Sequence, residues 1–420
     1  MRSGAVCRRR RSKTDLKTEY TKGGGETVSK KKILWICGIA WLKKDNTYFP
    51  EATYPGIVSG SAFQQAIIEG LEDQGYNVRI LSDCDMSSGE RLEWSHNGKS
   101  HDVRVAGNGN RFLRIPTKII HLFKEISRGD VLDGIEYVCA YEMHLPYLLC
   151  LHKIKKRNPH IKTVLICPDV SIYMDLDAKK KPVKSFLKQI EHILSHWLLK
   201  CVDGYVLFTE QMNEHFGKYG KPYTVIEGVY RNKYPLTETP KKNYIMHAGS
   251  LHYNIGIEEL IEAFEQLSDK TVELWFFGSG AMDGYIREKA KENNRIRHMG
   301  FVDPQLLFEY EKKAMLLVNV RDPKAEYTRY SFPSKTFEYM ASGTVFLTTD
   351  LPGIPAEYKD YIVTIPNNCV EEVKKGIEQV LVLSEEERDA IGKRARDFIL
   401  NRKNKDIQSR KFSGFLSALD

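Results

Sequence analysis

The sequence predicts an α/β fold made of two tandem Rossmann-like, doubly wound domains that face a central cleft. Three observations predict it. Apolar runs of strand length alternate with segments of helical periodicity. The alternation breaks once, in the polar, proline-containing stretch 231–242, and 420 residues exceed the size of one ordinary core. In such domains ligands bind outside the carboxyl ends of the strands.

Residues 1–32 are predicted to form a disordered basic tail. They hold 11 Lys and Arg against 3 Asp and Glu, and this difference of 8 equals the net charge of the whole chain, +8. The rest of the chain is therefore nearly neutral, so no nucleic-acid partner is expected. A nucleic-acid arm or an anchor for acidic lipids is the weaker interpretation of the tail.

Composition also bears on the compartment and on cofactors. The tail has no long apolar run of the kind that forms a signal peptide core, and no run of the chain reaches the length of a membrane span of about 18 residues. The eight cysteines form no CxxC pair, and most lie in apolar runs. This usage predicts buried thiols in a reducing cytoplasm, and neither a metal site nor a cofactor is expected.

The first domain is expected to span residues 33–235. Its first strand is 33–39, followed by a loop-rich segment to Gly60, a helix from Ser61 to Gly75 and a strand at 78–81. The same rhythm continues less sharply, with strands at 163–167 and 204–208 and a helix at 186–199.

The second domain is expected to span residues 236–395. Its strands are predicted at 244–248, 272–277, 296–300, 315–320 and 344–348, and its helices at 256–267, 282–292, 304–313 and within the motif 330–343. The charged segment 384–417 is predicted to be helical. Residues 396–420 are expected to form a C-terminal helix that packs back across the domains.

The motif 330–343 is the most informative stretch. With Ser334 as the N-cap of its helix, the amides of Lys335, Thr336 and Phe337 would lack partners within the helix and could receive a phosphate. Glu338, one turn further in, could accept hydrogen bonds from a hydroxyl of the same ligand. A phosphate and a sugar hydroxyl together indicate a nucleotide-sugar.

Two glycine-bearing turns follow strands of the same predicted sheet. Gly249 and Ser250 come after the first strand, and Gly278 and Gly280 after the second. Each turn alone is ordinary turn chemistry. Because the carboxyl ends of parallel strands share one edge, together they predict a place where backbone approaches a ligand.

Several motifs in order resemble the family 4 (group 1) retaining glycosyltransferases of the GT-B fold. The resemblance covers about residues 33 to 395 and is carried by HAGSL at 247–251, GIEELIEAF at 256–264, FGSG at 277–280, HMGFV at 298–302 and FPSKTFEYMASG at 332–343. The first half agrees through GIVSG at 56–60 and VDGYVLFTEQM at 202–212.

The resemblance implies a set of donor-binding residues. Glu338 matches the glutamate that holds the ribose, and the amides of Ser334 and Lys335 match the cradle for the diphosphate. Gly249 matches the turn against the donor phosphates, and Gly278 and Gly280 match the next turn. Met299 lies in the loop 298–302, which matches the segment whose backbone meets the base. Gly60 is the contribution of the first domain. The full set is Gly60, Gly249, Ser250, Gly278, Gly280, Met299, Tyr330, Ser334, Lys335 and Glu338.

The chain departs from the family pattern where the sugar is contacted. Tyr330 stands where the family usually has its first glutamate, so Glu326 is the candidate for that role. Asp169, in the sequence Cys-Pro-Asp after a strand, stands where the family often has His followed by Asp. It would orient the acceptor hydroxyl or the sugar, or else form a turn. His144 is a further candidate, although a lone histidine is more often structural.

The family's cationic pair around the diphosphate is also absent. Its positions hold Ser250 and Ile255. Breaking the glycosidic bond leaves negative charge on the diphosphate, and a cation must stabilise it. Lys335 and Arg321 are the nearest substitutes, and Arg329 is a poorer third; each could equally be a solvated charge.

The resemblance therefore predicts a retaining, metal-independent glycosyltransferase. It would move a sugar from a UDP- or GDP-sugar to a hydroxyl of a glycan or lipid-linked acceptor, in bacterial surface polysaccharide synthesis. The alternative is a GT-B scaffold or glycan-binding subunit without activity.

Two segments bear on where such an enzyme would act. The basic, amphipathic segments 111–124 and 179–188 either cover the sheet or make a peripheral contact with the inner face of the membrane. A cytoplasmic location is expected in both cases.

Overall fold

The computed structural model describes residues 31–38, 55–82, 91–96, 99–104, 114–170, 190–191, 193–231, 234–237 and 239–420. Residues 1–30 of the predicted tail and the basic segment 179–188 lie outside these ranges. Within them, no helix has both the length and the apolar character needed to cross a membrane.

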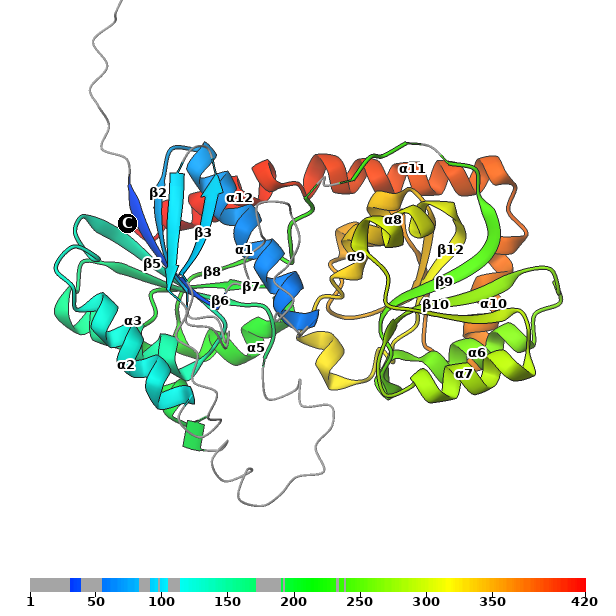
Figure 1. Cartoon of the computed structure of the whole chain (residues 1–420), viewed down its shortest axis with the longest axis horizontal. Helices are drawn as coiled ribbons and strands as arrows, with labels where there is room; N and C mark the ends of the chain where they lie inside the picture. The colour runs from blue at the N-terminus through cyan, green and yellow to red at the C-terminus, as the bar shows by residue number, and fades with distance from the viewer. Residues whose placement is uncertain are drawn as a thin grey trace, which may run out of the picture. The chain divides into compact units, whose positions relative to one another are not determined.

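The first domain is built on a parallel sheet of six strands in the order β2-β1-β5-β6-β7-β8 (Figure 1). Ile33 and Trp35 of β1 enter one hydrophobic cluster and Leu34 and Ile36 enter the opposite one. Successive side chains of a strand point to opposite faces, so both faces of this sheet are covered. The strands are β1 (Lys32–Cys37), β2 (Asn77–Ser82), β5 (Ile135–Tyr141), β6 (Lys162–Cys167), β7 (Gly204–Leu207) and β8 (Tyr223–Val225).

Among the described residues, the helices of the first domain are α1 (Pro55–Asp73), α2 (Arg114–Ile126), α3 (Leu145–Arg157), the short α5 (Asn213–Phe216) and a helical segment at 190–191 and 193–198. The domain also contains an antiparallel hairpin that the sequence did not predict, formed by β3 (Arg91–His96) and β4 (Lys99–Arg104). Short 3-10 turns complete the domain at η1 (Leu199–Cys201), η2 (Glu210–Met212) and η3 (Gly217–Tyr219).

Helix α1 corrects one expectation. It begins at Pro55, so Gly60 lies inside the helix rather than at the end of a loop before it. Proline is well suited to the first helical position, whereas the glycines at 56 and 60 weaken the helical pattern in the sequence. A Cβ on Gly60 would lie 3.1 Å from the Tyr141 hydroxyl. The glycine therefore lets α1 approach the end of β5 closely.

The second domain has a parallel sheet of six strands in the order β11-β10-β9-β12-β13-β14. The predicted fold class, two doubly wound α/β domains, is confirmed. The strands are β9 (Lys242–Ser250), β10 (Glu273–Ser279), β11 (Ile296–Gly300), β12 (Ala314–Asn319), β13 (Val345–Thr349) and β14 (Val363–Ile365). The helices are α6 (Ile257–Glu265), α7 (Asp283–Glu292), α8 (Pro304–Lys313), α9 (Lys335–Ser342) and α10 (Val370–Leu381), with 3-10 turns η4 (Tyr253–Ile255), η5 (Glu326–Arg329) and η6 (Ala356–Tyr361).

Two helices, not one, form the end of the chain. Helix α11 (Glu385–Arg402) starts with a capping box, and α12 (Lys405–Ser417) starts at Asn404, whose side chain accepts a hydrogen bond from the Ile407 amide. Because this cap begins a new helix, the periodic segment is interrupted. Phe412 and Leu416 of α12 join the core of the first domain. The chain thus ends by packing against the domain in which it begins.

Each sheet has one point where the strand order reverses. In the first sheet it lies between β1 and β5, and in the second between β9 and β12. Ligands of open α/β sheets bind beside such points, outside the carboxyl ends of the strands. A ligand site is therefore expected at these two edges.

Candidate active site

The strands β9 and β12 separate at their carboxyl ends, at the switch point of the second sheet. The two strands pair as far as Met246 and Leu317 and then separate. Beyond that point the ring of His247 spans the gap, with Nδ1 3.0 Å from the Val318 carbonyl oxygen. The Tyr339 hydroxyl accepts a hydrogen bond from the Ala248 amide at 2.6 Å and lies 3.1 Å from the Ala248 carbonyl. Side chains thus replace the neighbouring strand at the end of β9.

Four buried polar atoms of residues in or near β9, β12 and α9 lack partners among the described residues. His247 Nε2, Asn319 Oδ1, Arg321 Nε and Thr336 Oγ1 have none among the residues that the structure describes. A buried polar atom without a hydrogen bond is costly, and in native proteins such atoms generally find a partner. Their concentration at one sheet edge indicates a place completed by a bound molecule.

Burial sets the charge state of His247 and lowers the pKa of Arg321. It lowers the pKa of His247 to about 4, so the ring is neutral at pH 7. Since a carbonyl only accepts, Nδ1 carries the proton and Nε2 is a free acceptor. Burial also lowers the pKa of the Arg321 guanidinium. An arginine remains charged in proteins all the same, so Arg321 supplies a cation with an unpartnered donor.

The three turn glycines differ in what surrounds them. Gly249 has a φ of 147°, and a Cβ built on it would meet nothing within 4 Å. A Cβ on Gly278 would lie 1.9 Å from the Gly249 carbonyl oxygen, and one on Gly280 would lie 2.2 Å from that of Leu251. Gly278 and Gly280 therefore allow the neighbouring turns to pack, whereas Gly249, with exposed Ser250 beside it, faces open space.

The start of α9 differs in part from the sequence prediction. Ser334 precedes the helix, but its side chain makes no capping hydrogen bond, and its φ and ψ of −54° and −30° are helical. As a result the Thr336 amide donates to the Pro333 carbonyl at 2.9 Å and the Phe337 amide to the Ser334 carbonyl at 3.2 Å. Two of the three amides predicted to be open to a phosphate thus have acceptors.

Lys335 lies between two carboxylates. Its Nζ is 3.3 Å from Oε1 of Glu311 and 2.8 Å from Oε2 of Glu338. The Glu311 side chain is 1% exposed and that of Glu338 48% exposed. Burial opposes the charge on Lys335, but the two carboxylates outweigh it and raise its pKa above the ordinary value. A fixed cation and an accessible carboxylate thus stand side by side.

The loop before α9 contacts the first domain. The Tyr330 hydroxyl donates to Glu214 Oε2 at 2.9 Å, and its ring lies 4.5 Å from that of His215. Arg329 pairs with the other Glu214 oxygen at 2.6 Å. The structure thus places Tyr330 in a contact between domains rather than beside Lys335. Glu326 is exposed, at the start of η5.

Met299 lies at the end of β11, where it is partly buried against the core. The neighbouring His298 Nε2 is 3.3 Å from Oδ1 of Asp283, and the same oxygen accepts a hydrogen bond from the Gly280 amide at 3.0 Å. These contacts tie the turn after β10 to the end of β11. The predicted base-contacting segment is therefore held in a defined position.

The first domain contributes a carboxylate that the sequence reasoning missed. Glu142 follows β5 and is the one non-glycine residue with a positive φ, 75°, among those described. Its amide donates to the Ile166 carbonyl at 2.8 Å. Because β5 and β6 are neighbours, Glu142 and Asp169 follow adjacent strands at the same edge. The apolar run 137–141, read as a strand, would have revealed this position.

The carboxyl groups of Glu142 and Asp169 have pKa values well above those of ordinary carboxyl groups. The surrounding protein and the Asp169 carboxylate raise the pKa of Glu142 to about 7, against the opposing effect of Lys118, although Glu142 stays accessible to solvent. Burial raises the pKa of Asp169 to about 6. The backbone of Asp169 also pairs with that of Ser331, in the loop before α9. His144, by contrast, precedes α3 with its ring 5.1 Å from that of Tyr147.

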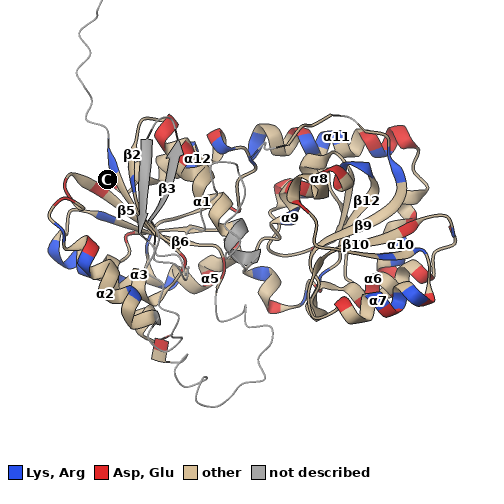
Figure 2. Cartoon of the chain, viewed as in Figure 1, with Lys and Arg blue, Asp and Glu red and all other residues tan. Residues whose placement is uncertain are grey.

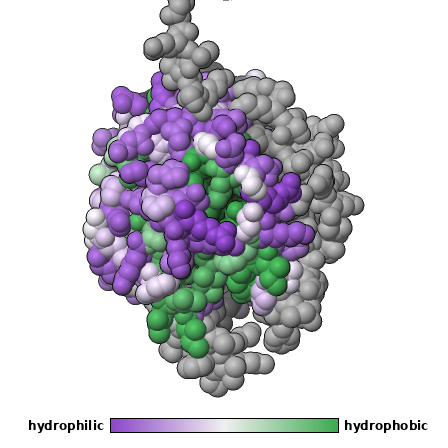
Figure 3. All heavy atoms as spheres, turned by 90° about the vertical axis from the view of Figure 1, so that its left-hand side faces the viewer, coloured by the Kyte–Doolittle hydropathy of each residue, from purple (hydrophilic) through white to green (hydrophobic). Residues whose placement is uncertain are grey.

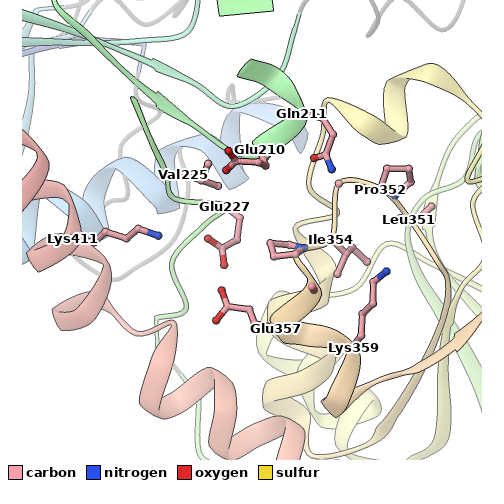
Figure 4. A pocket seen from close by; sticks show the side chains of 13 residues that line it. Glu210, Gln211, Val225, Glu227, Leu351, Pro352, Ile354, Glu357, Lys359 and Lys411 are labelled. Carbon is pink, nitrogen blue, oxygen red and sulfur yellow. The ribbon is translucent and has the colours of Figure 1, made fainter. Parts of the chain in front are cut away.

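A cavity of about 490 Å³ lies elsewhere, where the turn after β7 and helix α12 approach the loop after β13. Figure 4 shows Glu210, Glu227 and Glu357 around it, with Lys411 on α12. None of the predicted site residues lines this cavity. Among the described residues, no group of His, Cys, Asp and Glu is placed to hold a metal ion.

Comparisons with known proteins agree with this arrangement. Residues 242–382 match the family model described as glycosyl transferases group 1. Sucrose-phosphate synthase from Thermosynechococcus elongatus is similar over 93% of this chain and 99% of its own, with 12% identity and a TM-score of 0.67. No match was found among curated proteins.

Two further solved structures were determined with nucleotides. HepE from Anabaena, in complex with UDP, has a TM-score of 0.61 and 13% identity, covering 92% of this chain and 100% of its own. A structure described as trehalose-6-phosphate from E. coli, bound with UDP-2-fluoro glucose, has a TM-score of 0.61 and 11% identity, covering 92% and 98%. At these identities the likeness shows the fold, which is the expected GT-B arrangement.

Proposed function

We propose that this chain, whose residues 242–382 match the family model of group 1 glycosyl transferases, moves a sugar from a nucleotide-sugar to a hydroxyl acceptor. The acceptor is a glycan or a lipid-linked saccharide, the anomeric configuration is retained, and the product serves bacterial surface polysaccharide synthesis. The donor is a UDP-sugar in the first instance, since two of the similar structures hold UDP or a UDP-sugar.

One observation carries the proposal. The switch point of the second sheet combines an open glycine turn at Gly249 with a fixed cation at Lys335 and unpartnered buried polar atoms, among them Arg321 Nε. The oxygens of a diphosphate would accept hydrogen bonds from Lys335 and Arg321, and the diphosphate could approach the backbone at Gly249. Glu338, which remains accessible beside Lys335, would accept hydrogen bonds from the ribose hydroxyls.

Bond cleavage would place negative charge on the leaving diphosphate. We assign Lys335 and Arg321 to stabilising that charge, because a cation held in a water-poor site stabilises it more strongly than water does. They replace the pair that Ser250 and Ile255 do not provide. This assignment makes the cations the main contribution of the second domain to the rate.

The first domain would supply the acceptor side. Glu142 and Asp169 follow adjacent strands, and their pKa values of about 7 and 6 allow each to exchange a proton near neutral pH. We assign Asp169 to orienting the acceptor hydroxyl and Glu142 to accepting its hydrogen bond. Neither role requires Glu326, which stays exposed at η5.

A thermal-shift measurement with UDP, GDP and ADP tests the proposal, because a ligand that binds the native state raises the midpoint of unfolding. UDP is expected to raise it, and Glu338→Ala to abolish the shift. Glu371→Ala is the matched control, because Glu371 also occupies the first turn of a helix in the second domain. If no nucleotide stabilises the wild-type chain, the inactive scaffold is the better description.

A further inference from the structure

One helical segment of the first domain turns its apolar side outward. Residues 190–191 and 193–198 are helical. Ile190, Ile193, Leu194 and Trp197 recur at helical spacing and are 46%, 68%, 37% and 53% exposed. On the opposite side, Leu198 is 1% exposed. Four large apolar side chains exposed on one side of a helical segment are typical of an interaction surface rather than of an ordinary solvent-facing helix.

Helices α2 and α3 extend this surface. The His152 ring of α3 lies 5.2 Å from that of Trp197, and Lys153 Nζ lies 4.1 Å from the centre of the Phe123 ring on α2. Ile120, one turn before Phe123, is 67% exposed. On the side of the molecule shown in Figure 3, hydrophobic side chains gather along the lower rim beside hydrophilic ones.

Lysines accompany the apolar side chains. Helix α3 carries four basic residues in its last five positions and no Asp or Glu, and α2 carries a single acidic residue (Figure 2). Lys124, Lys156 and Lys200 are exposed. We call this surface the apolar–basic face; its residues are Ile120, Lys124, Lys153, Lys156, Ile190, Ile193, Leu194, Trp197 and Lys200.

We propose that the apolar–basic face docks on an anionic lipid bilayer. Exposed isoleucines, a leucine and a tryptophan would enter the interfacial layer, and the lysines would meet the anionic headgroups. Charge complementarity selects this occupant, since protein–protein interfaces are depleted in lysine whereas anionic bilayers attract it. The inference stands apart from transferase activity, because none of these residues belongs to the candidate active site.

Co-sedimentation of the full chain with large vesicles tests the proposal. Vesicles of phosphatidylcholine alone are compared with vesicles of equal parts phosphatidylcholine and phosphatidylglycerol. Wild type is expected to bind the mixed vesicles, and the triple variant I193S/L194S/W197S to lose most of that binding. Reversing Lys153 and Lys156 to Glu is expected to weaken it by at least about fivefold per lysine, because one lysine near an anionic surface has about that effect.

Two matched control variants test whether vesicle binding depends on this face rather than on any exposed apolar or basic side chain of the chain. Val382→Ser removes a side chain that is 82% exposed in the second domain, and Lys393→Glu reverses an exposed charge on α11. Both are expected to bind vesicles as wild type does. The basic tail is common to every variant, so its contribution cancels in the comparison.

The same variants are assayed for the UDP thermal shift, which is expected to be unchanged. An unchanged shift shows that they fold and separates this test from that of the transferase function. Equal vesicle binding by wild type and the triple variant would overturn the proposal. So would a wild-type dimer that the triple variant converts to a monomer, with no vesicle binding by either, because the face would then join two copies of the chain.

Discussion

Replacing Lys335 by methionine separates its role in binding from its role in the fold. Methionine keeps most of the side-chain volume but removes the charge that lies 3.3 Å from Glu311 and 2.8 Å from Glu338. If Lys335 contacts the donor diphosphate, the variant loses charge-assisted hydrogen bonds worth about 1.5–3 kcal/mol. The Kd for UDP is then expected to rise roughly 10- to 150-fold, as measured by isothermal titration calorimetry.

The same variant has a predictable effect on stability. Burial raises the pKa of Glu311 to about 7 even beside Lys335, and without that cation the pKa rises further. The folded state then holds a proton that the unfolded chain, with an ordinary glutamate pKa near 4.5, releases. The free energy of unfolding therefore falls as pH rises, by about 1.4 kcal/mol per pH unit up to the folded-state pKa.

Above pH 7 the wild type has already lost this contribution and its stability changes little further, so the two proteins diverge in alkaline solution. Adding Glu311→Gln removes the titrating carboxyl, and the double variant is expected to lose the steep pH dependence while keeping the weak UDP binding. Urea unfolding at several pH values measures the first effect. Wild-type UDP affinity in the folded double variant would refute the placement of Lys335 in the donor site.

Three further substitutions test other parts of the arrangement. In Asp169→Asn, the free energy of unfolding should equal that of wild type below pH 4 and exceed it by up to about 3 kcal/mol above pH 6. The reason is that burial raises the pKa of the Asp169 carboxyl to about 6 in the folded state, so its ionisation destabilises the wild-type fold. Urea unfolding measures this difference, and the rate of sugar transfer should fall. Glu142→Gln should remove the rise of kcat/KM through pH 7 that deprotonation of Glu142 gives the wild type. Gly228→Ala would set a Cβ 2.2 Å from the Phe337 ring at the start of α9, so calorimetric unfolding should show a loss of about 1–3 kcal/mol.

The sequence predicted most of the sheets because their strands are continuous apolar runs. Residues 33–37, 163–167 and 244–248 read directly as buried strands, and they are β-strands in the structure. The hairpin β3–β4 was not predicted because its strands, RLEWSH and KSHDVR, are largely polar and contain no long apolar run. The start of α1 was placed too late because glycines at 56 and 60 lower helix propensity locally, and tertiary packing overrides that preference.

The candidate site was predictable only where one short motif carries it. Lys335 and Glu338 stand within a contiguous pattern, so their proximity follows from helical spacing. Glu311 lies 24 positions before Lys335, on helix α8, and no motif around Glu311 predicts its contact with Lys335. The apolar run 137–141 marks the strand before Glu142, but only the pairing of β5 with β6 sets Glu142 at the same edge as Asp169. Long-range pairing of this kind appears only in the folded chain.

The position of Tyr330 yields a last prediction. Although the family usually has a glutamate there, restoring it as Tyr330→Glu is expected to destabilise the chain without raising transfer. Tyr330 is 5% exposed, packs on His215 and donates to Glu214, so the variant would lose a buried ring and set a carboxylate beside another. Loss of a buried aromatic side chain alone costs about 3–5 kcal/mol.

Tyr330→Phe is the control for that variant. It keeps the ring and removes the hydroxyl that donates to Glu214, for a cost of about 1 kcal/mol. Calorimetric unfolding and a radiolabelled transfer assay compare the three proteins. A Tyr330→Glu chain that is as stable as wild type and faster in transfer would show that this position still faces the sugar. The loop from Arg321 to Lys335 would then have to leave Glu214 when the donor binds.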